Sequence, residues 1–78
     1  MNFKIGQIFK KNGRTMCLID FFNYNNLNVA LFMFDDNKFD YKFYSVYDTG
    51  TNYELIEIED EQMTNELFSI VEERIKDE

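Results

Sequence analysis

The most constraining feature of this sequence is an apolar stretch from residue 16 to residue 34, MCLIDFFNYNNLNVALFMF. β-Branched and aromatic residues, which favour strands, lie on both sides of a polar break at Asn25-Asn26. Residues 16–22 and 29–34 lack a clean alternation of apolar and polar side chains, which is typical of strands covered on both faces. The stretch therefore predicts a hairpin of two central strands.

The register of this hairpin depends on its turn. Asparagine tolerates the positive φ of a two-residue turn, and such a turn at Asn25-Asn26 pairs Phe22 with Val29. It also pairs Ile19 with Phe32, whereas a longer loop would shift the register. The run VALFMF would promote aggregation at a sheet edge, so we expect another element to cover it.

A second hairpin is predicted at the N-terminal end. Strands over residues 5–11 and 14–22 flank Asn12-Gly13, a dipeptide typical of type I′ turns, in which both central residues need positive φ. This turn places Lys11 opposite Arg14, so two like charges face each other. We expect an anion or an acidic partner to relieve the repulsion, or dissolved salt to screen it.

Residues 39–47, FDYKFYSVY, alternate as a half-buried strand does. The side predicted to point mostly inward carries Phe39, Tyr41, Phe43, Ser45 and Tyr47. The side predicted to face solvent carries Asp40, Lys42, Tyr44 and Val46. An exposed tyrosine among charges resembles an interface anchor, so we predict that Tyr44 contacts a partner.

The remainder of the chain predicts one more strand and a helix. Residues 53–58, YELIEI, alternate after turn residues, and five strands joined by short turns form an antiparallel meander. Asp60 can cap a helix over residues 61–76. The apolar stripe of this helix comprises Met63, Leu67, Phe68, Ile70, Val71 and Ile75. The sequence thus predicts a single α+β domain over residues 1–78, a five-stranded and barrel-like meander covered by one C-terminal helix.

The charge of the chain is uneven. The net charge is −7, yet residues 1–16 carry Lys4, Lys10, Lys11 and Arg14 and no acid. The acidic remainder repels phosphate backbones and attracts basic surfaces. We therefore predict a basic protein partner rather than direct nucleic-acid binding, with solubility alone as the competing explanation for the acidity.

Several chemistries lack sequence support. There is no histidine, which excludes histidine-based catalysis and most zinc sites. The single Cys17 cannot form an internal disulfide, and no phosphate-binding glycine motif is present. The acidic turn at residues 35–38, even with Asp40 added, does not match a calcium loop. We expect no enzyme activity, no cofactor, no metal site, no membrane span and a cytoplasmic location.

Two segments resemble the small acidic YrzB-like family of uncharacterised proteins from Firmicutes. These segments are DFFNYNNLNVALF, residues 20–32, and YELIEIEDEQMTNELFSIVEERI, residues 53–75. The resemblance implies a sheet and a C-terminal helix, and it brings no known activity or site residue. One departure is the basic segment at residues 10–14, at a turn that tends to be acidic in that family.

Two functional hypotheses follow. The first is a non-enzymatic inhibitor or adaptor that docks on a basic, nucleic-acid-binding surface of another protein, as phage-encoded anti-defence or anti-CRISPR proteins do. The residues expected to contact this partner are Asp35, Asp36, Asp40, Tyr44, Glu54, Glu57, Glu59, Asp60, Glu61, Glu66 and Glu73. The alternative is a bacterial housekeeping protein of YrzB-like type that forms a homo-oligomer, such as a homodimer, through an aromatic edge strand.

Overall fold

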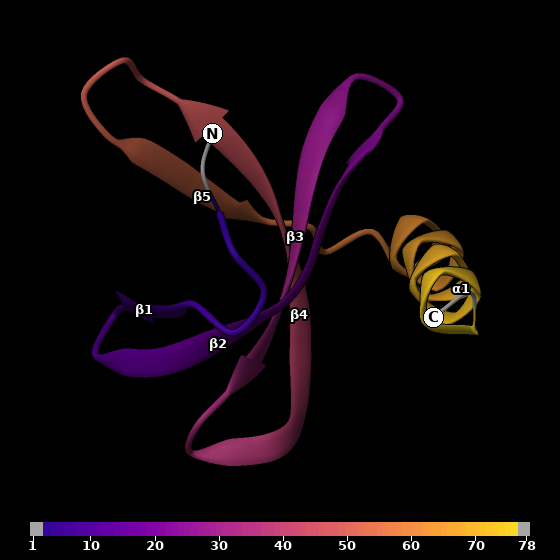
Figure 1. The fold of residues 1–78 in the computed structure, drawn as a ribbon, viewed down its shortest axis with the longest axis horizontal. Coiled ribbons are helices and arrows are strands. Elements are labelled where there is room, and N and C mark those ends of the chain that lie inside the picture. Colours follow the sequence, from indigo (N-terminus) through magenta and orange to yellow (C-terminus); the bar gives the residue numbers. More distant parts are fainter. Residues whose placement is uncertain (1–2, 77–78) are drawn as a thin grey trace.

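The computed structural model describes residues 3–76, which form an antiparallel sheet of five strands and one helix. The strands pair in chain order, and the sheet curls into half of a barrel (Figure 1). The elements are β1 Ile8–Lys11, β2 Arg14–Tyr24, β3 Leu27–Phe34, β4 Asn37–Asp48, β5 Tyr53–Glu57 and α1 Glu61–Lys76. The predicted fold class, an α+β meander covered by a C-terminal helix, is confirmed.

Two asparagine-containing turns set the register of the first three strands. Asn12 and Gly13 have φ values of 54° and 78°, and Asn25 and Asn26 have φ values of 49° and 66°. Positive φ at both central residues is what a type I′ turn requires. Both predicted turns are therefore confirmed, as are the predicted pairs Lys11 with Arg14 and Phe22 with Val29.

The predicted pairing of Ile19 with Phe32 is wrong, because a β-bulge interrupts β2. Leu18 lies opposite Phe32 and Asp20 lies opposite Leu31, which leaves Ile19 as the extra residue. A bulge of one residue changes the side of the sheet that the following side chains face. As a result Leu18 is buried on the concave side, whereas Asp20 reaches the helix on the convex side.

The concave side of the curled sheet holds one apolar core. Its fully buried members come from β2, β3 and β4, and aromatic rings from the N-terminal segment and β1 pack against them. Ring centroids of Phe9 and Phe32 lie 5.3 Å apart, and those of Phe32 and Tyr44 lie 5.6 Å apart, both edge-to-face. The buried residues are Met16, Leu18, Ala30, Phe32, Phe34, Tyr44 and Val46.

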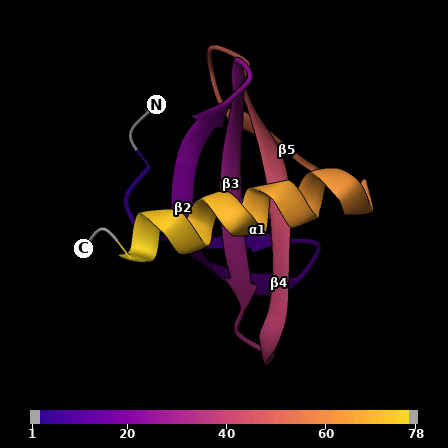
Figure 2. The same ribbon diagram turned by 90° about the vertical axis from the view of Figure 1, so that its right-hand side faces the viewer.

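The convex side holds a second core, which the helix covers. Figure 2 shows α1 crossing β2, β3 and β4. Leu67 and Val71 of the helix are buried against Phe22, Val29, Leu31 and Phe43 of the sheet. The helix therefore covers the apolar run of β3, as predicted. Among the described residues, no helix combines the length and apolar character that a membrane crossing requires.

The prediction that β4 has one buried and one exposed side is wrong. Phe43, Tyr44, Ser45 and Val46 are all buried, because the helix covers one side of the strand and the curl of the sheet covers the other. The ends of β4 extend beyond the helix (Figure 2). Three aromatic residues that were expected to point mostly inward are consequently exposed, namely Phe39 at 93%, Tyr41 at 43% and Tyr47 at 45%.

Several strand ends differ from the predicted ones. β1 begins at Ile8 rather than at residue 5, because Gly6 adopts a φ of 89° in a turn closed by a hydrogen bond from the Gln7 amide to the Lys4 carbonyl. β2 runs on to Tyr24, and β3 begins at residue 27. β4 spans residues 37–48 rather than 39–47, and β5 ends at residue 57. The helix has the predicted bounds.

Candidate functional site

The acidic residues predicted to contact a partner lie in three regions of the structure. The first is the end of the β3–β4 hairpin, where Arg14 of β2 binds two of the predicted carboxylates. Its Nη2 lies 2.8 Å from Asp36 Oδ1 and 2.9 Å from Asp40 Oδ2. These hydrogen bonds raise the pKa of Arg14, and the same guanidinium lowers the pKa of Asp36. The charge of this end is thus largely offset within the chain, and Asp35 remains exposed beside it.

These contacts show what offsets the positive charge of Arg14 opposite Lys11. The two residues do face each other across the first turn, but the acids beside Arg14 belong to the same chain. The Arg14 guanidinium also lies over the Phe34 ring, 3.8 Å from its centroid. The expected external anion is therefore not needed at Arg14.

The second region is β5. Glu57 is half-buried, and its Oε1 lies 3.4 Å from Lys42 Nζ. Glu54 is exposed. Because side chains alternate along a strand, Glu54 shares a side with Ile58, which packs against the helix-covered core. The two glutamates therefore point to opposite sides of the sheet.

The prediction that Tyr44 is an exposed interface anchor is wrong. Only 4% of Tyr44 is exposed, and its ring packs on Phe32 in the concave core. Burial raises the pKa of its hydroxyl, and the carboxylate of Glu57 adds to the effect. The alternation of β4 and a barrel-like sheet were predicted, but it was not predicted that the curl of the sheet covers the side of Tyr44.

The third region is the outer surface of α1 and the loop before it, which we name the helix acidic surface. It includes five of the residues predicted to contact a partner and one further acidic residue, Glu72, and all six are exposed. From residue 59 to residue 76 the chain has six acids and two bases. The members of the surface are Glu59, Asp60, Glu61, Glu66, Glu72 and Glu73.

The start of the helix positions two of these acids. Asp60 Oδ1 accepts a hydrogen bond of 3.1 Å from the Met63 amide, which is the predicted helix cap. One turn later the Tyr24 hydroxyl donates a hydrogen bond of 2.5 Å to Glu66 Oε2, and this bond raises the pKa of Tyr24. Tyr24 belongs to the β2–β3 hairpin, so the bond joins that turn to the helix.

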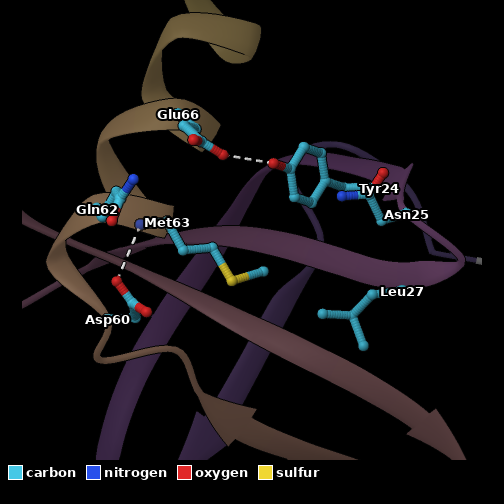
Figure 3. Close-up of a pocket in the computed structure, with 7 residues that line it drawn as sticks. All are labelled: Tyr24, Asn25, Leu27, Asp60, Gln62, Met63 and Glu66. Atoms are coloured by element: carbon cyan, nitrogen blue, oxygen red, sulfur yellow. Dashed lines mark hydrogen bonds between the residues drawn. The ribbon is translucent and has the colours of Figure 1, made fainter.

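A pocket of about 340 Å³ lies between this turn and the first turns of the helix (Figure 3). We name it the helix-side pocket. The Tyr24 ring and the side chains of Leu27 and Met63 supply its apolar wall, and Asp60 and Glu66 place carboxylates beside it. Apolar walls next to carboxylates match the side chain of a lysine or an arginine, which has an aliphatic stem and a charged head.

Sequence reasoning missed the ion pair between Asp20 and Arg74. Arg74 donates hydrogen bonds of 2.7 Å from Nε to Asp20 Oδ2 and of 3.0 Å from Nη2 to Asp20 Oδ1. The Phe21 amide also donates to Asp20 Oδ1, at 2.8 Å. The sequence signal for this pair is one aspartate in the most apolar part of the chain, since a buried carboxylate needs a partner.

Comparison with known proteins adds no family to these observations. No family model, no curated protein and no solved structure matches the chain. Within residues 3–76, no group of three or more cysteine, aspartate or glutamate side chains is arranged so that it could hold a metal ion.

Proposed function

We propose that this chain is a non-enzymatic binding protein that docks its helix acidic surface on a basic surface of another protein. An inhibitor or adaptor that covers a nucleic-acid-binding surface is the form of this function that we favour. The observation that carries the proposal is the concentration of six exposed acids at residues 59–73, none of which belongs to the ion pairs of Arg14 and Lys42. Opposed surface charges accelerate encounter and fix orientation.

The helix-side pocket supports the proposal at the level of one side chain. A lysine or arginine of the partner could lay its stem against Met63 and Leu27 and its charged head beside Glu66 and Asp60. The ring of Tyr24 offers a further attraction to a cation. Surface charge alone gives modest affinity. We therefore expect one side chain of the partner, bound in this pocket, to supply most of the binding energy.

The experiment that tests this proposal compares two variants of equal net charge. Glu72→Gln with Glu73→Gln removes two charges from the helix acidic surface, and neither side chain makes a hydrogen bond within the described residues. Asp35→Asn with Glu54→Gln removes two charges elsewhere and is the control. The native chain and both variants are immobilised and exposed to bacterial lysate at low salt, and bound proteins are eluted with salt or with duplex DNA.

We expect the native chain and the control to retain basic, nucleic-acid-binding proteins that duplex DNA displaces. The helix variant should retain several-fold less, because neutralising contacting charges slows encounter and weakens binding. Equal retention by the two variants would assign the effect to net charge alone. Retention of proteins that DNA does not displace would contradict a nucleic-acid-binding target.

A homo-oligomer is a second candidate, and one observation favours it. β5 pairs only with residues 44–48 of β4, so within the described chain residues 37–42 have no strand on that side. This free edge carries Phe39 and Tyr41, both exposed. An exposed aromatic edge can pair with the same edge of a second copy.

A further inference from the structure

Another cavity, of about 370 Å³, is lined by residues of the β1–β2 hairpin and of β3, β4 and β5. We name it the half-barrel cavity. It lies on the concave side of the sheet, whereas the helix acidic surface lies beyond the convex side. Its lining includes Leu55, the Phe34 ring beneath the Arg14 guanidinium, and the side chains of Lys11, Lys42 and Tyr44. Its size falls within the range of pockets that bind small molecules.

The Tyr44 hydroxyl is a polar group of this cavity that has no hydrogen-bond partner within the described residues. Tyr44 is 4% exposed, and its hydroxyl makes no hydrogen bond within residues 3–76. No fully enclosed side-chain oxygen or nitrogen in that range lacks a hydrogen bond, so the hydroxyl must reach solvent, and Tyr44 lines this cavity. Burial raises the pKa of the hydroxyl, which therefore stays protonated and can donate.

The charges around the cavity favour a single negative charge. Lys11 makes no ion pair within the described residues, and the contact of Lys42 with Glu57 is long, at 3.4 Å. Arg14 also lines the cavity; two carboxylates at its Nε and Nη2 offset its charge, whereas its Nη1 makes no hydrogen bond within the described residues. Glu57 also lines the cavity, so a dianion would meet repulsion there.

We propose that the half-barrel cavity binds a small aromatic carboxylate. The carboxylate accepts hydrogen bonds from the Tyr44 hydroxyl and the Lys11 ammonium, and the aromatic body packs against Leu55 and against the Arg14 guanidinium, which itself covers the Phe34 ring. Charge-assisted hydrogen bonds hold the head, and burial of the ring excludes water from them. This site is independent of the proposed docking function, since it uses none of the helix acidic surface.

The test is a titration of the isotope-labelled full chain with benzoate, followed by NMR chemical shifts. Benzyl alcohol provides the same ring without the charge, and inorganic phosphate provides charge without a ring. We expect saturable shifts around Lys11, Tyr44 and Leu55 with benzoate, and much weaker ones with the other two probes. Equal binding of phosphate would indicate an adventitious ion only, and equal binding of benzyl alcohol would indicate an apolar cavity only; either result overturns the proposal.

Two substitutions sharpen the test. Tyr44→Phe should weaken benzoate binding about tenfold, because a hydrogen bond to a charged group is lost, whereas the control Tyr41→Phe should leave it unchanged. Glu57→Gln should strengthen binding several-fold, because it releases Lys42 and removes a repelling charge. Thermal melts of each variant verify folding. Unchanged affinity in Tyr44→Phe, or weaker binding in Glu57→Gln, would overturn the assignment.

Discussion

Asp20 is the most buried carboxylate among the described ion pairs, and its partner Arg74 is much more exposed. The Asp20 side chain is 11% exposed, whereas the Arg74 side chain is 49% exposed. A charge that loses its partner is costly in proportion to its isolation from water. Substitution of Arg74 and substitution of Asp20 should therefore lower the free energy of unfolding by different amounts, although both remove the same ion pair.

We predict that Arg74→Met lowers the free energy of unfolding by about 3 kcal/mol, because it leaves the Asp20 carboxylate buried without its counter-charge. Asp20→Asn should cost about 1 kcal/mol, since the amide can still accept a hydrogen bond and the arginine remains hydrated. Urea unfolding measures both. Lys76→Met, which removes an exposed cation from the same last turn of the helix, is the control and should have almost no effect. A larger loss in Asp20→Asn than in Arg74→Met would contradict this assignment.

Tyr44 and the two carboxylates at Arg14 show how far the environment of a single residue could be predicted from the sequence. The alternation of β4 was read from the sequence, but the burial of Tyr44 depends on the curl of the sheet, which no local pattern encodes. The carboxylates Asp36 and Asp40 were proposed as partner contacts because they lie in an acidic stretch. Their actual partner, Arg14, is more than twenty residues away in sequence, and only the pairing of three strands brings it near.

At the scale of elements, predictions succeeded where a local backbone requirement decided the outcome. Asn12-Gly13 and Asn25-Asn26 turn because asparagine and glycine tolerate positive φ, and Asp60 caps the helix because its oxygen satisfies a free amide. The bulge at Ile19 was not predicted. It places Leu18 in the concave core and Asp20 beside the helix, so it depends on packing on both sides of the sheet. A strict alternation would send Leu18 and Asp20 to the same side.

The packing of the helix on the sheet yields a prediction at this scale. Leu67 is fully buried in the convex core, so Leu67→Ala should cost about 2–5 kcal/mol in urea unfolding. The loosened helix should also uncover the apolar run of β3, which would appear as increased light scattering on mild heating. Ile75→Ala is the matched control, because Ile75 is 59% exposed, and it should cost less than about 0.5 kcal/mol. A similar loss in both variants would contradict the proposed role of the helix as the cover of the sheet.

At the scale of the whole molecule, one sheet serves two cores. A chain of this length buries a modest fraction of its surface, so both sides of the sheet are used. Phe3 helps to close the concave side, because its ring lies 5.2 Å from that of Phe9, 5.0 Å from that of Phe21 and 4.8 Å from that of Tyr53. Phe3 thus contacts β1, β2 and β5, and so it links the two edge strands of the sheet. No pattern in the sequence predicted these contacts.

β4 has 12 residues and β5 has 5, and this difference in length leaves the edge on which the homo-oligomeric alternative depends. Where β4 runs past β5, its edge is open and Phe39 is 93% exposed. If two copies pair along this edge, the native chain should sediment as a dimer at micromolar concentration, and Phe39→Ser should convert it to a monomer, because the central apolar contact of the pair is lost. Tyr47→Ser is the control, since Tyr47 is also exposed but lies where β5 already occupies the edge. A native chain that sediments as a monomer at these concentrations would eliminate the alternative, and it would leave the helix acidic surface as the stronger basis for function.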